Sequence, residues 1–219
     1  MSFMRELDKS AEYIWRESAD SVFLTEMREG RLSAKKFREY IVQDSIYLRD
    51  YLKAYAMAIF KSRSLKEMQV FNTVLGFVND SENATRLKYL EDFGMTDDDV
   101  EKIAKRPECE AYTKFLIDTA VNEDIPEILM AVMPCMFGYY DVFAMIREAA
   151  PEIMDTYYGP LVADYTSEGY AASCDYWMDF ADSVCEGIEG ERLERLKQIY
   201  IEGSKHELYF WEMAGKDYE

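Results

Sequence analysis

The chain has few of the residues on which several common kinds of enzyme chemistry depend. Among its 219 residues there is one histidine, His206, and its four cysteines (Cys109, Cys135, Cys174 and Cys185) form no CxxC pair. Zinc sites are built from closely spaced cysteine and histidine ligands, so none is indicated. A Ser-His-Asp or Cys-His pair would have to use His206. We therefore expect any nucleophile in this protein to be activated by a carboxylate.

Basic residues and long apolar runs are also scarce. The chain has 25 lysines and arginines against 43 acidic residues, a formal net charge of -18. This charge disfavours binding to nucleic acid or to an anionic membrane surface. No stretch reaches the roughly 18 uninterrupted apolar residues of a membrane span, and residues 1–8 lack the features of a secretory signal. These observations predict a cytoplasmic protein with no nucleic-acid or membrane partner, in which the cysteines are free thiols.

Signals for β-strands are missing too, and helical periodicity takes their place. No segment keeps a period-two alternation, and there is no Asn-Gly or Asp-Gly hairpin signal and no glycine-rich phosphate loop. Apolar residues at helical spacing predict the main helices over 6–27, 33–61, 64–93, 108–122, 126–149, 170–185 and 191–214, with short helices after 96, 151 and 161. The sequence therefore predicts an all-α protein, with residues 1–219 forming one helical-bundle domain.

One cysteine occupies an unusual position. Cys135 directly follows Pro134 inside the apolar helical stretch 128–141. A proline within a helix removes a backbone hydrogen bond and reshapes the preceding turn. Cys135 is either a small buried hydrophobic residue, the common role of a reduced cysteine, or a thiol placed beside a functional site. The pattern alone leaves both interpretations open.

Two acidic residues interrupt apolar helix faces. Asp44 has the spacing of the face that carries Tyr47, while Glu207 shares a side with Gly203 and Phe210. Gly203 would let another backbone or a ligand approach closely. Either acid could instead lie at the solvent edge of its helix, because carboxylates are rarely buried without a partner.

If Asp44, Glu207 and Cys135 converge inside the bundle, they form a pocket with two carboxylates and a thiol. Aromatic walls favour a flat ring, and a carboxylate accepts hydrogen bonds from an amino group on that ring. An aminated heterocycle is therefore a natural ligand. A di-iron carboxylate bundle is a competing interpretation, but it requires Glu-x-x-His pairs, and Glu207 directly follows the single histidine.

Four separated segments carry a resemblance to a known family. They are residues 37–51 (FREYIVQDSIYLRDY), residues 111–113 (AYT), Met133-Pro-Cys135 with Gly138-Tyr-Tyr140, and residues 207–214 (ELYFWEMA). Together, and in this order, they resemble the TenA, or thiaminase II, family over nearly the whole chain. One segment departs from the family pattern, because Leu161 stands where the motif Trp-Ile-x-x-Tyr has tryptophan, while Tyr165 matches its tyrosine.

The resemblance implies a fold, an assembly and a set of site residues. It implies a heme-oxygenase-like arrangement of helices, a homotetramer, and a site that needs no metal or organic cofactor. The implied catalytic residues are Cys135 as nucleophile and Glu207 as acid/base, and the implied substrate-binding residues are Asp44, Tyr47, Tyr112, Tyr139 and Tyr165.

The activity implied by the resemblance is hydrolysis at the 5-methylene of 4-amino-5-aminomethyl-2-methylpyrimidine. The products are the hydroxymethyl pyrimidine and ammonia, in salvage of thiamin breakdown products, with thiamin itself as a further candidate substrate. Retention of Cys135 favours this hydrolytic branch of the family. The alternatives are a regulatory or binding protein, since the family was formerly labelled a transcriptional activator, and a redox or oxygenase-like relative on the same scaffold.

Overall fold

The structure is a computed structural model that describes residues 2–80 and 82–218, with only the backbone of 74–80 and 82–83. Every regular element in these described residues is a helix, as the sequence predicts. The elements are α1 (Phe3–Ser10), α2 (Glu12–Ala19), α3 (Val22–Arg28), α4 (Ala34–Lys61), α5 (Leu65–Asp80), α6 (Glu82–Asp92), α7 (Asp97–Val100), α8 (Pro107–Asn122), α9 (Ile125–Ala149), the 3-10 helix η1 (Pro151–Asp155), α10 (Gly159–Tyr165), α11 (Glu168–Cys185) and α12 (Gly190–Ala214).

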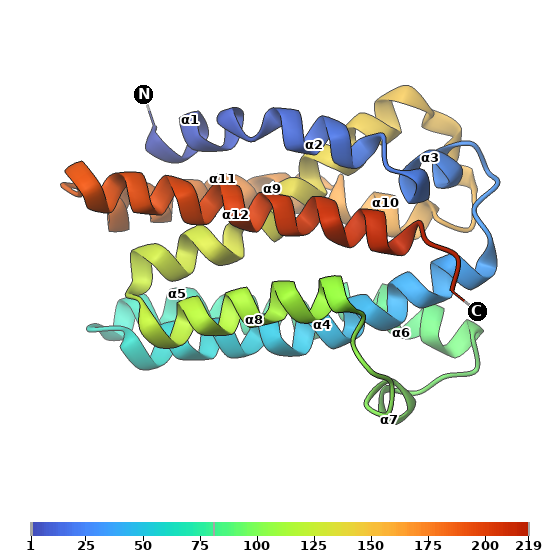
Figure 1. Ribbon diagram of the computed structural model, residues 1–219, viewed down its shortest axis with the longest axis horizontal. Coiled ribbons are helices and arrows are strands. Elements are labelled where there is room, and N and C mark those ends of the chain that lie inside the picture. Colours follow the sequence, from blue (N-terminus) through green and yellow to red (C-terminus); the bar gives the residue numbers. More distant parts are fainter. Residues whose placement is uncertain (1, 81, 219) are drawn as a thin grey trace.

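The long helices lie roughly parallel or antiparallel in a bundle (Figure 1). The C-terminal helix α12 runs through the middle of the view, with α1 and α2 along one side and α4 and α8 along the other. It packs most extensively on α9, and it also contacts α2 and α8. Helices α4, α8, α9 and α12 therefore enclose a common interior, where side chains distant in sequence can meet.

The N-terminal segment differs from the prediction of one helix over 6–27. Three helices, α1 to α3, cover this region. The clearest break is at Ser21, whose extended backbone ends the preceding turn and whose hydroxyl accepts a hydrogen bond from the Leu24 amide at 3.4 Å. The apolar stripe continues across the breaks, so Ile14, Trp15 and Phe23 are all buried.

The helix predicted over 64–93 corresponds to α5 and α6. Residue 81, between them, lies outside the described residues. The predicted C-terminal cap at Gly94 is confirmed, since this glycine has a φ of +66°. Its amide donates to the Glu91 carbonyl at 2.9 Å, and the Met95 amide donates to that of Leu90. Only glycine adopts this left-handed conformation without strain.

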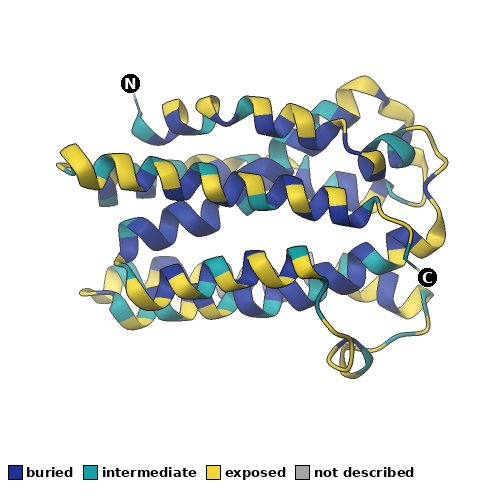
Figure 2. Ribbon diagram, in the orientation of Figure 1, coloured by how far each residue is buried: buried dark blue, intermediate teal, exposed yellow. Residues whose placement is uncertain are grey.

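Helix α9 continues on both sides of Pro134 and forms the centre of the bundle. Gly203 of α12 lies against it so closely that an added Cβ would be 2.9 Å from Pro134 Cγ and 3.2 Å from the Ala131 carbonyl oxygen. Helix α9 is apolar and long enough to cross a membrane, yet 67% of its apolar window is buried inside the protein. Figure 2 shows the same predominance of buried residues along it, which is typical of a core helix.

Candidate active site

Helix α4 supplies the first wall of the site. Tyr40, Asp44, Tyr47 and Tyr51 follow one another at steps of four, three and four residues and are all buried. Ser33 begins this helix, and its hydroxyl accepts a hydrogen bond from the Lys36 amide at 3.2 Å. Of the two interpretations of Asp44, the structure therefore has the inward-facing one.

Glu207 of α12 is buried beside a tyrosine hydroxyl and a cysteine thiol. It is 2% exposed, and the Tyr112 hydroxyl donates to its Oε1 at 2.6 Å. The Cys135 thiol lies close enough to this carboxyl group to lower its pKa. The interpretation of Glu207 as an ordinary exposed acid is wrong. Burial raises the pKa of Glu207 to about 8, although Tyr112 and Cys135 both act to lower it, so the carboxyl group can hold a proton at neutral pH.

The four cysteines differ in accessibility. Cys109, Cys174 and Cys185 are buried, whereas Cys135 is only partly buried. Burial raises the pKa of Cys109 and of Cys185 to about 12, and that of Cys174 still further. These three are the small buried hydrophobic residues of the alternative interpretation. Cys135 is partly exposed, and it lies close enough to the carboxyl group of Glu207 to lower its pKa.

Asp44 lies on a second hydrogen-bonded chain. The Tyr139 hydroxyl donates to Asp44 Oδ1 at 3.4 Å, and the Tyr40 hydroxyl donates to that of Tyr139 at 3.3 Å. The negative charge of Asp44 also contributes to raising the pKa of Glu207. The two carboxyl groups predicted to share a site are thus close enough to influence each other.

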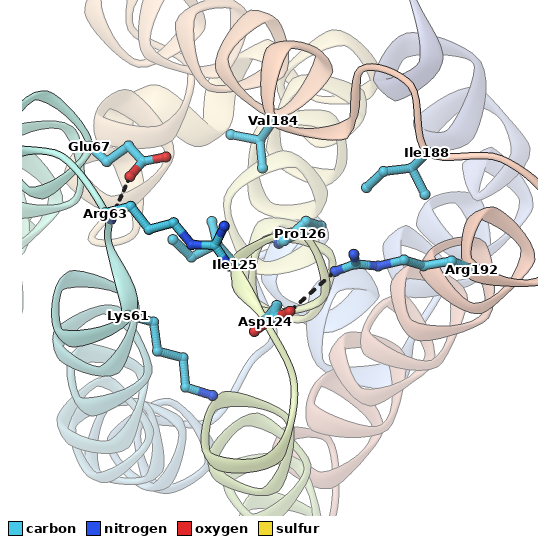
Figure 3. A pocket seen from close by; sticks show the side chains of 9 residues that line it. All are labelled: Lys61, Arg63, Glu67, Asp124, Ile125, Pro126, Val184, Ile188 and Arg192. Carbon is cyan, nitrogen blue, oxygen red and sulfur yellow. Dashed lines mark hydrogen bonds and ion pairs between the residues drawn. The ribbon is translucent and has the colours of Figure 1, made fainter.

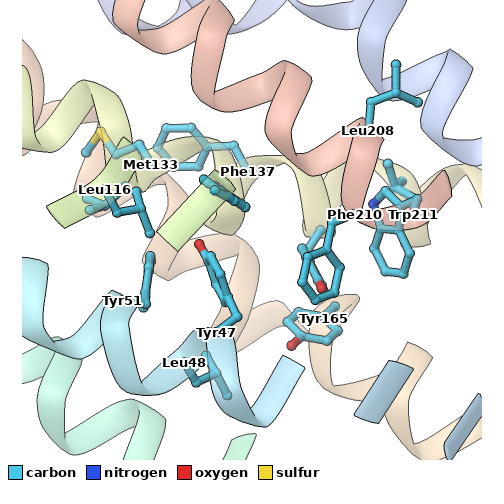
Figure 4. Packing of buried hydrophobic residues seen from close by; sticks show 14 of the residues in the cluster. Tyr47, Leu48, Tyr51, Leu116, Met133, Phe137, Tyr165, Leu208, Phe210 and Trp211 are labelled. Atoms are coloured by element: carbon cyan, nitrogen blue, oxygen red, sulfur yellow. The ribbon is translucent and has the colours of Figure 1, made fainter. Parts of the chain in front are cut away.

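Aromatic rings surround these polar groups. The ring of Tyr47 lies 4.8 Å from that of Tyr112, and the ring of Tyr139 lies 4.7 Å from that of Tyr165. Figure 4 shows the Tyr47 hydroxyl directed toward Phe137 of α9. That hydroxyl is buried near the Tyr112 hydroxyl but makes no hydrogen bond of good geometry. A buried hydroxyl without a partner is a group that a ligand atom can satisfy.

The sequence alone assigned no site role to Trp211 and Phe210, which pack against these rings. Trp211 stacks on Tyr40 at 5.3 Å and lies 4.9 Å from the Tyr139 ring. Phe210 lies 5.8 Å from the Tyr47 ring. Both residues follow Glu207 by three and four positions, so helical spacing already places them on its side of α12.

Helix α10 carries the segment that departs from the family pattern. Leu161 is 7% exposed and belongs to the hydrophobic core. Tyr165, four residues later, stacks almost parallel on Phe143 with ring centroids 5.3 Å apart. The ring predicted to bind substrate is therefore fixed between Phe143 and Tyr139.

A hollow of about 280 Å³ at the N-terminal end of α9 has a different character (Figure 3). Its charges are mostly engaged with protein groups: Arg192 binds Glu127 at 2.7 Å and Asp124 at 3.7 Å, and Lys61 donates to backbone carbonyls. No cysteine or tyrosine lines it. Within the part of the chain that the structure describes, no three His, Cys, Asp or Glu side chains gather as metal ligands.

Comparison with known proteins agrees with this arrangement of helices. The model of the TENA/THI-4/PQQC family matches residues 8–216. The chain belongs to this family. The resemblance and the all-α fold predicted from the sequence are thereby confirmed, whereas the roles of the individual site residues stay predictions.

Members of the family with known names or structures cover almost the whole chain. The aminopyrimidine aminohydrolase of Halalkalibacterium halodurans is 25% identical over 98% of this chain and 96% of its own length. That of Helicobacter pylori is 24% identical over 98% of this chain and 99% of its own. The solved structure of the TenA homologue protein from P. horikoshii OT3 covers 98% of each chain with a TM-score of 0.83 and 27% identity.

Proposed function

We propose that this protein hydrolyses 4-amino-5-aminomethyl-2-methylpyrimidine at its 5-methylene carbon, giving the hydroxymethyl pyrimidine and ammonia. The observation that carries the proposal is the partly exposed Cys135, whose thiol lies close enough to the buried carboxyl group of Glu207 to lower its pKa. The names of the two aminopyrimidine aminohydrolases, which match over nearly the whole chain, support the same reaction.

The pair of Cys135 and Glu207 explains how a thiol is activated without a histidine. In the fraction of molecules in which Glu207 is ionised, its carboxylate takes the thiol proton. Burial raises the pKa of Glu207 to about 8, close to the ordinary pKa of a thiol, so this proton transfer costs little. The thiolate adds to the ring carbon beside the one that bears the aminomethyl group. Glu207 then transfers its proton to a ring nitrogen, so that no charge builds up on the ring.

The remaining steps return the enzyme to its starting state. The resulting enamine expels the amine, which takes up a proton and leaves as ammonia, and an exocyclic methylene is produced. Water adds to this methylene and gives the hydroxymethyl group, and the proton that the water releases replaces the one taken by the ammonia. The ring nitrogen returns its proton to Glu207 as the bond between the ring carbon and Cys135 breaks. Glu207 passes this proton back to the thiolate, which restores the thiol and the carboxylate.

The other residues of the site bind and orient the ring. Asp44 accepts a hydrogen bond from the 4-amino group, in place of the long 3.4 Å contact from Tyr139. Tyr47 and Tyr112 on one side, and Tyr139 and Tyr165 on the other, provide the flat surfaces on which the ring stacks.

The wider assignments belong to the same proposal. We expect thiamin to be a second substrate, with thiazole as the leaving group. We expect the active form to be a cytoplasmic homotetramer of single-domain chains. Gel filtration with light scattering measures the assembly directly.

The proposal is tested by comparing two substrates with purified protein. With the aminopyrimidine as substrate, ammonia and the hydroxymethyl pyrimidine should appear in equal amounts. With thiamin as substrate, the reaction is measured by the release of thiazole. If neither substrate yields product, the proposal is wrong and the regulatory or binding interpretation takes its place.

A further inference from the structure

The only histidine of the chain lies beside the candidate active site without lining it. His206 precedes Glu207 on α12, and its ring stacks on that of Tyr112 with centroids 5.1 Å apart and planes 7° from parallel. Tyr112 is the residue whose hydroxyl donates to Glu207 at 2.6 Å. Two consecutive residues of α12 therefore contact one tyrosine, His206 at its ring and Glu207 at its hydroxyl.

The ring of His206 is held between neighbours. Phe115, one turn after Tyr112 on α8, lies 5.1 Å from it, and Tyr209 meets it edge-on at 6.3 Å. His206 is half-buried and faces an outer groove of about 450 Å³ that α8 and α12 line. Neither Cys135 nor Glu207 lines this groove. The His206 ring thus contacts the site through Tyr112.

We propose that His206 is a positioning residue: its ring holds Tyr112 in the orientation in which the hydroxyl reaches Glu207, and so sets how tightly that carboxyl group binds its proton. The effect on turnover rests on the function proposed above, whereas the effect on Glu207 does not depend on it. The Tyr112 ring also contacts that of Tyr47 at 4.8 Å. Removal of the histidine ring frees Tyr112 to turn, because it loses its most nearly parallel contact.

The electrostatic surroundings favour a neutral imidazole in this role. Burial lowers the pKa of His206, although the charge of Glu202 opposes that change. The other charged groups in the groove are Lys114, Asp118, Glu123 and Arg195. The titratable groups that face Glu207 come from three other helices: Asp44 and Tyr47 of α4, Tyr112 of α8, and Cys135 and Tyr139 of α9. These groups also influence the pKa of Glu207, and they stay the same in the His206 variants.

The proposal is tested by titrating Glu207 in substrate-free protein, for example by its carbonyl infrared band, which Glu207→Gln assigns. His206→Ala should raise the pKa of Glu207 by about one unit, since the hydrogen bond that favours the carboxylate is weakened. His206→Phe keeps a flat ring at the same place and should leave that pKa near the wild-type value. With the aminopyrimidine, His206→Ala should lower kcat about tenfold with KM changed less than twofold, and His206→Phe should restore it.

Two further variants make the test specific. Tyr209→Ala, at an exposed residue that meets His206 only edge-on, should change neither quantity. In a Tyr112→Phe background, His206→Ala should have no additional effect on Glu207, since the hydroxyl through which it acts is gone. If His206→Ala does not fold, His206→Asn replaces it.

The proposal is wrong if the pKa of Glu207 is the same with and without the histidine ring. It is equally wrong if His206→Ala shifts that pKa by the same amount when Tyr112 is already phenylalanine. Failure of the wild-type protein to release ammonia would contradict the proposed function alone, because the titration needs no substrate.

Discussion

Two carboxyl groups in this protein each accept a short hydrogen bond from a tyrosine, and they differ in the cysteine that lies beside them. Glu207 accepts from Tyr112 at 2.6 Å, and Asp8 accepts from Tyr200 at 2.5 Å. Burial raises the pKa of both carboxyl groups. A cysteine lies in each neighbourhood, so by residue type the two clusters are similar.

The cysteines make the difference. Cys135 is partly exposed and lowers the pKa of Glu207, whereas Cys174 is 5% exposed in a small hollow of about 160 Å³ that Asp8 and Asp141 also line. Burial, and then the charges of these two aspartates, raises the pKa of Cys174 well above its ordinary value. An acid, a tyrosine and a cysteine are therefore insufficient as a signature. What distinguishes the candidate site is a partly exposed cysteine beside a buried carboxyl group.

The largest expected difference between the two clusters is in activity. Cys135→Ala should lower kcat for the aminopyrimidine on the order of ten-thousandfold, because the nucleophile is removed. Cys174→Ala is the matched control and should retain the wild-type kcat. Circular dichroism should give the same helical content for both. Full activity of Cys135→Ala would remove this thiol from the mechanism.

Thiol reactivity separates the clusters without any substrate. A pKa of about 12 in place of 9, as at Cys109 and Cys185, leaves about a thousandfold less thiolate. Iodoacetamide at pH 8 should therefore alkylate Cys135 first in the native protein, and all four cysteines after unfolding. Mass spectrometry of the digested protein identifies the modified residue. Equal labelling of Cys174 and Cys135 in the native state would contradict the comparison.

Replacing each of the two carboxyl groups by an amide should affect kcat very differently. The loss at Glu207 should be about a hundredfold or more, which is typical for loss of a general acid or base. Glu207→Gln keeps the shape of the side chain but can no longer carry a proton between the thiol and the ring, so kcat should fall by that amount. Asp8→Asn makes the same change in the other cluster and should leave kcat within about twofold. Steady-state ammonia release measures both, and equal losses in the two variants would argue against a special role for Glu207.

The smallest expected effect is on stability. The pKa of Glu207 is raised from 4.5 to about 8 in the folded protein, so its contribution to the free energy of unfolding is full below pH 4.5 and is lost as pH rises toward 8. The Glu207→Gln side chain does not ionise, so this variant does not lose stability as the pH rises. Its melting temperature should match that of the wild type near pH 4 and exceed it near pH 9 by roughly 10 °C. A difference that is constant from pH 4 to pH 9 would show that Glu207 does not titrate in this range.

Much of the fold follows from the sequence because the signals are local. Helical spacing predicts the course of α4, α9 and α12, and it puts Asp44 on the face of Tyr47 that proves to be buried. The break at Ser21 was missed because the apolar stripe continues through it, so only the capping hydroxyl indicates the new helix start.

The site is harder to predict because its decisive features come from tertiary contacts. The buried carboxyl group of Glu207 accepts a hydrogen bond from Tyr112, which lies 95 positions away in the chain and on another helix. Spacing alone favoured an ordinary exposed acid at this position. In the same way, spacing does not predict the accessibility of Cys135 or Cys174, since each is covered, or left open, by other helices.

The central claim is that one flat ring meets Cys135, Glu207 and Asp44 together, and a crystal structure with the hydroxymethyl pyrimidine product tests it most directly. The account predicts the 4-amino group within hydrogen-bond distance of Asp44 and a ring nitrogen within that distance of Glu207. It also places Cys135 Sγ against the ring carbon beside the hydroxymethyl group. A ring bound in the hollow beside Asp8 or at the N-terminal end of α9, with Cys135 out of contact, would contradict it.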